Sequence, residues 1–251
     1  MNINIFSVRD CIDSFEIVKI LERKGIKANV FSIVKTNKKT LPNFKLKYDF
    51  IVLTSSKAVK CFLQYLRLYK KRFKKIPKTF VVGPETAKTL KKNGFIDFYQ
   101  ASGNSKSLLN LILSNTKIYS KGLWLCGRHR NSYIKDYLLK HKRFLKNRVV
   151  YEMSQKDFIS EHLLIKLKNK EENYFLVNSS RNVSLLTMLL KKYYIFDKIK
   201  KNSIVVTMSK NIYNKSLENG WGKNQLIPET LREKYLDKFI HSLNLKENSN
   251  G

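Results

Sequence analysis

Short apolar runs that end in small polar residues recur along the whole chain, and a helix-like pattern of apolar residues follows most of them. After the run at residues 50–54, for example, Val59, Phe62 and Leu66 share one helix face. Strands that alternate with helices of this length are typical of parallel sheets covered by helices on both faces. We therefore expect an α/β protein, with strands over residues 4–7, 28–34, 50–54, 79–83, 98–101, 123–126, 149–152, 174–178, 204–207 and 225–227.

Helices are expected between these strands, over residues 14–24, 58–68, 85–93, 105–113, 131–141, 182–192, 210–219 and 229–243. Two polar segments, 35–47 and 154–172, have neither pattern and are interpreted as connectors.

An internal repeat divides the chain into two similar halves. The sequence SSKAV at 55–59 returns as SSRNV at 179–183, and VVG at 81–83 returns as VVT at 205–207, in both cases 124 residues later. Duplication of a unit of about 120 residues explains the common order and spacing. The alternative is two unrelated doubly wound domains with similar apolar strands. The pattern leaves open whether each unit folds by itself or exchanges its opening piece with the other.

The chain has 50 Lys and Arg against 19 Asp and Glu, a net charge of +31. Such an excess attracts polyanions, so a basic nucleic-acid-binding protein is one reading. The lysines are scattered along the chain beside many asparagines, however, and dispersed charge of this kind is typical of a solvated surface. No aromatic and basic motif of a known nucleic-acid-binding module is present.

The three cysteines and four histidines do not form a recognisable metal or disulfide pattern. The cysteines lack a CxxC pair, and the histidines lack metal-ligand spacing. Cys126 is interpreted as buried strand packing rather than a nucleophile. No apolar run is long enough to cross a membrane. A reducing cytoplasm is the expected location.

The turns after the strands are the places where chemistry is expected. Ligands of open α/β sheets bind beyond the carboxyl ends of the strands, where helix N-termini favour anions. Thr54, Ser55 and Ser56 follow one strand, and Ser179 and Ser180 follow its counterpart. One hydroxyl in each turn can cap the next helix, and the others remain available to a ligand.

Gly83 and Thr86 lie in another such turn, whose counterpart contains Ser209. Gly83 permits close approach of a ligand to the backbone, although capping of the helix is a simpler explanation for much of this turn.

Two arginines, Arg128 and Arg130, stand in the turn GRHR at 127–130. Guanidinium groups bind carboxylates and phosphates through two parallel hydrogen bonds. Arg9 occupies a comparable place in the first unit, and the chain has only ten arginines in all. The alternative is that these are ordinary surface arginines.

Taken in order, these turns resemble the uroporphyrinogen-III synthase family. The resemblance runs over nearly the whole chain, although no single motif is diagnostic. The matching segments are FIVLTSSKAV at 50–59, VVGPETAKTL at 81–90, NGF at 93–95, LCGRHR at 125–130, VVYE at 149–152, FLVNSSRNV at 175–183 and residues 205–217, followed by GW at 220–221.

The resemblance implies two doubly wound α/β domains joined by a two-stranded linker, with the N-terminal segment paired to the C-terminal half. Domain one would then comprise residues 1–34 and 154–251, and domain two residues 35–153. The substrate would lie between the domains.

The implied reaction converts the linear tetrapyrrole hydroxymethylbilane, an octacarboxylate, to uroporphyrinogen III. Water is lost, the macrocycle closes and ring D is inverted, without a metal or organic cofactor. Tyr151 stands at the family's tyrosine position and would assist departure of the hydroxyl group as an acid, unless its ring only packs in the linker. Thr86 matches a hydroxyl position of the family. The chain departs at Thr207-Met208, where many relatives have a start like Gly-Pro, and Ser209 keeps a hydroxyl group.

The substrate-binding residues expected on this basis are Arg9, Thr54, Ser55, Ser56, Gly83, Thr86, Arg128, Arg130, Ser179, Ser180 and Ser209. Beyond hydroxymethylbilane we expect no obligate nucleic acid, no membrane and no second subunit. The competing hypothesis to catalysis is a binding module that takes up an acidic metabolite through the same turns.

Overall fold

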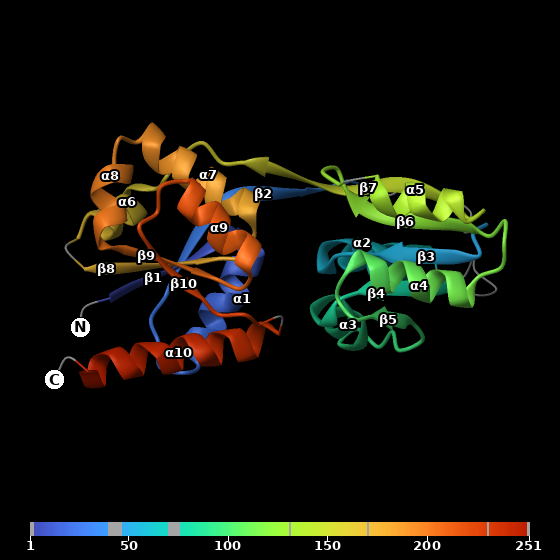
Figure 1. Cartoon of the computed structure of the whole chain (residues 1–251), viewed down its shortest axis with the longest axis horizontal. Coiled ribbons are helices and arrows are strands. Elements are labelled where there is room, and N and C mark those ends of the chain that lie inside the picture. Colours follow the sequence, from blue (N-terminus) through green and yellow to red (C-terminus); the bar gives the residue numbers. More distant parts are fainter. Residues whose placement is uncertain are drawn as a thin grey trace. The chain divides into compact units, whose positions relative to one another are not determined.

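The chain folds into two compact units of α/β structure. The structure, a computed structural model, describes residues 3–39, 47–69, 76–130, 132–169, 171–229 and 231–249. Unit 1 comprises Met1–Lys35 and Ser154–Gly251, and unit 2 comprises Thr36–Met153. Both consist of mainly parallel strands that alternate with helices, as Figure 1 shows. The predicted α/β class is therefore confirmed.

In unit 1 the strands lie in the order β10-β9-β8-β1-β2, and every neighbouring pair is parallel. The strands are β1 (Ile3–Asp10), β2 (Asn29–Lys38, whose last three residues belong to unit 2), β8 (Glu172–Val177), β9 (Ser203–Thr207) and β10 (Lys223–Leu226). The helices are α1 (Cys11–Glu22), α6 (Glu161–Lys168), α7 (Ser180–Lys192), α8 (Phe196–Ile199), α9 (Lys210–Glu218) and α10 (Arg232–Ser249).

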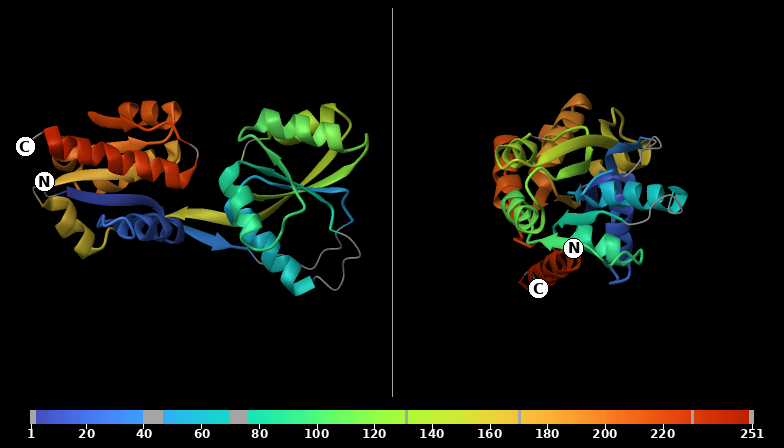
Figure 2. Two further views of the ribbon diagram at one scale, coloured as in Figure 1. Left: turned by 90° about the horizontal axis from the view of Figure 1, so that it is seen from below. Right: turned by 90° about the vertical axis from the view of Figure 1, so that its right-hand side faces the viewer.

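Helices cover both faces of the unit 1 sheet. On one face α1 and α10 lie beside each other, and α10 runs along the sheet (Figures 1 and 2). Their contact with the strands includes Leu21, Tyr174 and Phe239, all at most 1% exposed. On the other face Phe175 stacks on Phe6 and packs edge-on against Trp221. Alternate residues of β8 thus enter opposite cores, as the pleat of a strand requires.

In unit 2 the strands lie in the order β7-β6-β3-β4-β5, again with parallel neighbours. The strands are β3 (Phe50–Leu53), β4 (Lys78–Val82), β5 (Tyr99–Ala101), β6 (Lys121–Gly127) and β7 (Phe144–Gln155, whose last two residues belong to unit 1). The helices are α2 (Ser56–Tyr69), α3 (Pro84–Lys91), α4 (Ser105–Asn115) and α5 (Tyr133–Lys140).

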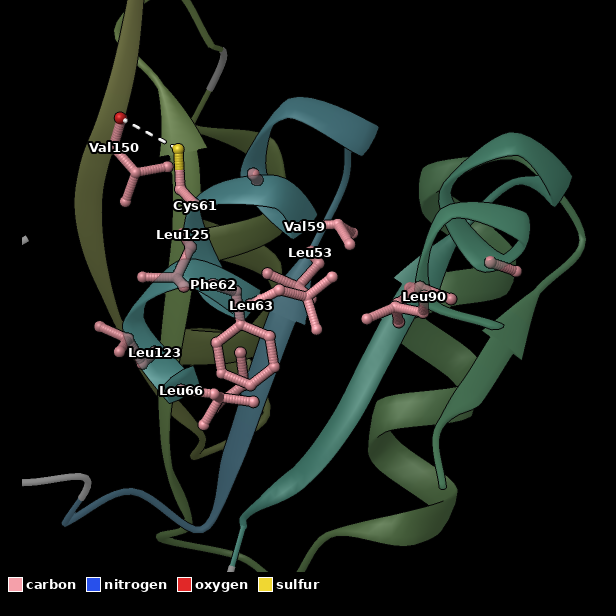
Figure 3. Packing of buried hydrophobic residues seen from close by; sticks show 14 residues of the cluster. Leu53, Val59, Cys61, Phe62, Leu63, Leu66, Leu90, Leu123, Leu125 and Val150 are labelled. Carbon is pink, nitrogen blue, oxygen red and sulfur yellow. Dashed lines mark hydrogen bonds between the residues drawn. The ribbon is translucent and has the colours of Figure 1, made fainter. Parts of the chain in front are cut away.

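Two apolar cores flank this sheet. Leu53, Leu123 and Leu125 point to the face covered by α2 and α3, where Phe62 and Leu90 meet them (Figure 3). Their neighbours along the strands, such as Phe50, Val52 and Trp124, point to the face covered by α4 and α5. Strands buried on both faces read as continuous apolar runs, which is why residues 50–53 could be recognised as a strand.

Strands β2 and β7 are neighbours and run in opposite directions. In unit 1 the amide of Lys156 donates to the carbonyl of Ile33 at 2.9 Å, and in unit 2 the amide of Lys39 donates to the carbonyl of Val150 at 2.9 Å. The residue numbers rise along one strand as they fall along the other, so this pairing is antiparallel.

The expectation that segments 35–47 and 154–172 are plain connectors was wrong in part for both. The segment 154–172 contains helix α6, and β7 continues to Gln155. The helix forms because Leu167, 1% exposed, enters the core of unit 1 while charged residues around it face solvent. The other predicted connector, 35–47, begins inside strand β2, which continues to Lys38, and its residues 40–46 lie outside the described residues. Among the helices that the structure describes, none is long and apolar enough to cross a bilayer.

Candidate active site

The turns singled out in unit 2 lie at one edge of its sheet. Strands β3, β4 and β6 are parallel, so their carboxyl ends point the same way. Ser55, Gly83 and Gly127 stand in the turns after β3 and β4 and at the end of β6. The N-termini of α2 and α3 begin at this edge and present backbone N–H groups to it.

Ser55 and Tyr151 meet at this edge although they are far apart in the sequence. The Tyr151 hydroxyl oxygen lies 3.2 Å from Ser55 Oγ, and either group can be the donor. Ser55 Oγ also accepts a hydrogen bond from the amide of Ala58 at 3.2 Å, in the first turn of α2. The predicted acid is therefore fixed to a helix N-terminus through a second hydroxyl group.

The other two hydroxyl residues of this turn have different surroundings. Thr54 Oγ1 accepts a hydrogen bond from the indole Nε1 of Trp124 at 3.2 Å. Ser56 is the first residue of α2 and is partly exposed. Thr54 is thus tied to the sheet, whereas Ser55 and Ser56 line the helix start.

Arg128 is held by an ion pair with Glu152 that no local sequence pattern indicates. Its Nε lies 2.5 Å from Glu152 Oε1, and Lys39 Nζ lies 3.4 Å from Glu152 Oε2. The Arg128 hydrogen bond, followed by the weaker contributions of Lys39, holds the pKa of Glu152 below its ordinary value. One carboxylate thus faces two cations, and the triad carries a net positive charge. The Arg128 side chain is half exposed.

Arg130 behaves differently from Arg128. Its terminal nitrogen donates to the carbonyls of Gly127 at 3.3 Å and Arg128 at 3.0 Å. The side chain therefore folds back onto its own turn and closes it. A binding role for Arg130 remains a prediction, and in this structure the guanidinium stabilises the turn that carries Arg128.

Gly83 and Thr86 contribute to the same edge in unequal ways. Gly83 is the N-cap of α3 with φ of 80°, a conformation that favours glycine. Thr86 is the third residue of α3, in its first turn, and is only 6% exposed, because it shares a helix face with the buried Leu90.

Arg9 in unit 1 is largely buried. It is the second-last residue of β1, two residues before the start of α1. Its guanidinium lies 3.4 Å from Asp13 Oδ2, with 17% of its side chain exposed. Burial lowers the pKa of Arg9, whereas the Asp13 carboxylate opposes that shift. A ligand carboxylate would thus meet an arginine that already has an anionic partner.

The remaining hydroxyl residues cap helices in unit 1. Ser179 Oγ accepts from the amide of Asn182 at 3.1 Å and so caps α7, of which Ser180 is the first residue. Ser209 precedes α9 as its N-cap without a side-chain bond to the helix. The Asn182 amide group donates to the carbonyl of Val8 at 3.3 Å, which ties this turn to the end of β1.

Glu152, Lys39 and Trp124 contact the candidate site residues, and the sequence pattern did not indicate these contacts. Glu152 adjoins Tyr151 in the matched VVYE segment, which was a usable signal. The contacts of Lys39 and Trp124 depend on the pairing of β7 and on the spacing across the sheet, and no local pattern indicates either.

Among the residues that the structure describes, no three His, Cys, Asp or Glu side chains come together as ligands. Cys126 is buried, and burial raises the pKa of its thiol, which agrees with a packing role.

Two of the solved structures with a similar fold come from Helicobacter pylori and Thermus thermophilus. Uroporphyrinogen-III synthetase from Helicobacter pylori 26695 superposes with a TM-score of 0.63 at 15% identity, covering 96% of this chain and 99% of that one. A mutant uroporphyrinogen III synthase from Thermus thermophilus gives a TM-score of 0.59 at 13% identity, covering 97% of this chain and 99% of that one. At such identities the likeness shows a shared fold. No curated protein sequence matches the chain.

The sequence itself matches the model of a protein family described as Uroporphyrinogen-III synthase HemD, over residues 16–235. This match spans most of the chain and includes every turn described above except that of Arg9. The chain therefore belongs to the uroporphyrinogen-III synthase family.

Proposed function

We propose that this chain performs its family's reaction, the cyclisation of hydroxymethylbilane to uroporphyrinogen III, with Tyr151 at the reaction centre. Family membership makes the chain a lyase of tetrapyrrole biosynthesis. The observation that carries the assignment of Tyr151 is its hydrogen bond to Ser55, at the carboxyl edge of parallel strands and beside a helix N-terminus. Ligands of open α/β sheets bind at such edges.

The reaction needs one proton at the hydroxyl that leaves. The carbon–oxygen bond of the hydroxymethyl group breaks as the pyrrole nitrogen supplies electrons, and the oxygen leaves as water. The resulting azafulvene is attacked by the substituted carbon of ring D, the spiro intermediate opens, and the ring closes again with loss of a proton. The proton that is lost at closure balances the one taken up by the leaving hydroxyl.

Tyr151 would donate to the leaving oxygen. Ser55 Oγ already accepts from Ala58, so its own hydrogen can point to the Tyr151 oxygen. In that arrangement the phenolic hydrogen is directed away from Ser55 and toward the substrate. A positioned proton donor of this kind contributes about 10²-fold or more to a rate.

The cations and helix N-termini would bind the substrate carboxylates. Arg128 is held at Nε by Glu152, which leaves the terminal nitrogens of its fork outside that ion pair. The distance between these two terminal nitrogens matches the distance between the two oxygens of a carboxylate, so they can bind it through two parallel hydrogen bonds. Backbone amides at the starts of α2, α3, α7 and α9 would bind further carboxylates, with Ser55, Ser56, Gly83, Ser179, Ser180 and Ser209 in those turns.

Three predicted binding residues would act less directly. Thr54 is bonded to Trp124, Thr86 is buried in α3, and Arg9 is paired with Asp13. We propose that Thr54 and Thr86 shape the turns, and that Arg9 adds positive potential. Arg130 would keep the Arg128 turn closed.

We further propose that the two units are the family's two domains, 1–34 with 154–251 and 35–153, joined by β2 and β7 as the linker. The pairing of β1 with β8 supports the return of the N-terminal segment to the C-terminal half. The bonds of Ile33 with Lys156 and of Lys39 with Val150 support the two strands of the linker. A monomer in the cytoplasm remains part of the proposal, and the free cysteines are in keeping with that location.

Turnover separates this function from its rival. An acidic-metabolite binding module would bind hydroxymethylbilane without changing the rate at which the type III isomer forms. The test is to incubate the purified chain with hydroxymethylbilane, oxidise the products to porphyrins and separate the isomers chromatographically. Enrichment of the type III isomer that scales with protein concentration supports catalysis, whereas binding with only the type I product supports the module.

A further inference from the structure

Strand β7 carries one extra residue where it passes the end of β6. Cys126 is paired with Val149, but the next residue, Gly127, is paired with Tyr151. The skipped residue, Val150, is fully buried, and its carbonyl accepts from the Cys61 thiol at 3.5 Å and from the Lys39 amide at 2.9 Å. Figure 3 shows the Cys61 contact. The bulge is therefore fixed from the core side, and it sets Tyr151 opposite a glycine.

The Tyr151 ring occupies the space where a side chain of residue 127 would stand. A Cβ on Gly127 would lie 2.8 Å from Cζ of Tyr151 and 2.9 Å from both Cε2 and the hydroxyl oxygen. Carbon atoms that are not bonded to each other have their optimal separation at about 3.5–4.0 Å, and real Cβ atoms essentially never approach another heavy atom within 3.0 Å. The Gly127 backbone is outside the left-handed region, and the three atoms nearest to an added Cβ all belong to Tyr151, so the ring is the nearest obstacle to a side chain here.

The backbone of Tyr151 is fixed independently of its ring. The Arg128 amide donates to the Tyr151 carbonyl at 3.2 Å. A side chain at position 127 would therefore leave the strand in place and turn the phenol away, because Tyr151 is only partly buried where it packs against the core of unit 2. Rotation would break the 3.2 Å contact between the hydroxyl groups of Tyr151 and Ser55.

We propose that Gly127 is a positioning residue for Tyr151. Its missing side chain lets the phenol lie against the end of β6 with its hydroxyl in reach of Ser55. The consequence for the reaction rests on the proposed function of Tyr151, whereas the placement of the ring does not.

The direct test compares Gly127→Ala with the control Gly222→Ala, a glycine outside the left-handed region where an added Cβ would meet no atom within 4 Å. A 3-fluorotyrosine placed only at position 151 reports the ring by ¹⁹F NMR. We expect the resonance to move in Gly127→Ala and to stay in Gly222→Ala. An unchanged resonance in Gly127→Ala overturns the inference, whatever the activity of the chain.

Kinetics then test the consequence. Because small misplacements of a reacting group reduce rates up to about 10²-fold, we expect kcat of Gly127→Ala to fall by roughly 10–100-fold with KM nearly unchanged. In the Tyr151→Phe background, the same change should lower kcat no further, since the hydroxyl is already absent. A further fall of similar size would mean that Gly127 acts by another route.

Two outcomes separate this inference from the proposed function. If the ¹⁹F resonance shifts in Gly127→Ala but the wild-type chain never forms the type III isomer, the placement of the Tyr151 ring by Gly127 is supported and the proposed function is contradicted. If the wild-type chain is active but Gly127→Ala changes neither the ¹⁹F resonance nor kcat, the proposed function stands and the positioning role of Gly127 is contradicted. If Gly127→Ala unfolds the chain, the double variant Gly127→Ala, Tyr151→Ser tests whether the steric overlap with the Tyr151 ring is the cause. A folded double variant supports the overlap. A double variant that is still unfolded contradicts it.

Discussion

The hydroxyl groups of Ser55 and Tyr151 lie 3.2 Å apart, although the two residues are 96 positions apart in the chain. Ser55 is held by the first turn of α2, and Tyr151 by the pairing of β7 with the end of β6. Two regular elements thus determine where the phenol points. Groups placed on strands and helices hold their geometry better than groups on free loops.

The first prediction concerns the Tyr151 hydroxyl. In Tyr151→Phe we expect kcat to fall by about 10–100-fold while KM changes little, because the lost group would act on the leaving oxygen and not on the carboxylates. Steady-state kinetics with isomer separation measure both constants. Tyr194→Phe, at a residue that is 97% exposed, is the matched control and should be unaffected. An equal rate in Tyr151→Phe would leave the ring with a packing role only.

A second prediction concerns Arg128. In Arg128→Ala we expect KM to rise by about 10-fold or more, since a charge-assisted bidentate contact is lost. Arg67→Ala removes the same charge from an exposed position of unit 2 and controls for the general positive field. Equal increases in KM for both variants would mean that total charge, rather than this side chain, draws the substrate.

The ion pair of Glu152 predicts a pH dependence of stability. Arg128 and Lys39 lower the pKa of Glu152 in the folded chain, so the carboxylate stabilises the fold above its ordinary pKa. That contribution is lost as the pH falls through the lowered folded value. In urea unfolding we expect the wild type to exceed Glu152→Gln in stability at neutral pH, with the difference shrinking below about pH 4. A difference that is constant with pH would contradict the assignment.

The fourth prediction tests the packing of unit 2. A Cβ at Gly122 would lie 2.2 Å from Cζ of Phe50, whose side chain is completely buried. We expect Gly122→Ala to lower the free energy of unfolding by about 1–3 kcal/mol through overpacking. Gly222→Ala, where the added carbon meets nothing within 4 Å, should change it much less. Denaturant unfolding of the two variants measures the difference. Equal free energies of unfolding for Gly122→Ala and Gly222→Ala would show that the Phe50 side chain moves to accommodate the added carbon.

Much of the fold could be predicted because its signals are local. Continuous apolar runs identify strands buried on both faces, and each predicted strand overlaps one in the structure, as with residues 50–54 and β3. Lengths were less predictable: β7 begins at Phe144 rather than near 149. Its first residues, FLKNR, show no strand-like alternation, and they gain their strand conformation from pairing with β6. Helix α6 was missed because its apolar face is short.

The candidate site was harder to predict because its partners come from distant segments. From the sequence, Arg128 and Arg130 were predicted to have the same role. In the structure Arg128 forms an ion pair with Glu152, whereas Arg130 donates a hydrogen bond to a carbonyl of its own turn. The difference arises from the register of β7, which no local pattern reveals. The burial of Thr86 could have been predicted from the sequence, because Leu90, four residues later, lies on the same helix face. The substrate contacts of these residues remain predictions.

The measurement that bears most directly on the central claim is the isomer composition formed from hydroxymethylbilane at increasing concentrations of the purified chain. We predict that uroporphyrinogen III rises in proportion to the chain and becomes the main product, at a rate well above spontaneous closure. Formation of the type I isomer alone, at the same rate with and without the chain, would contradict the account.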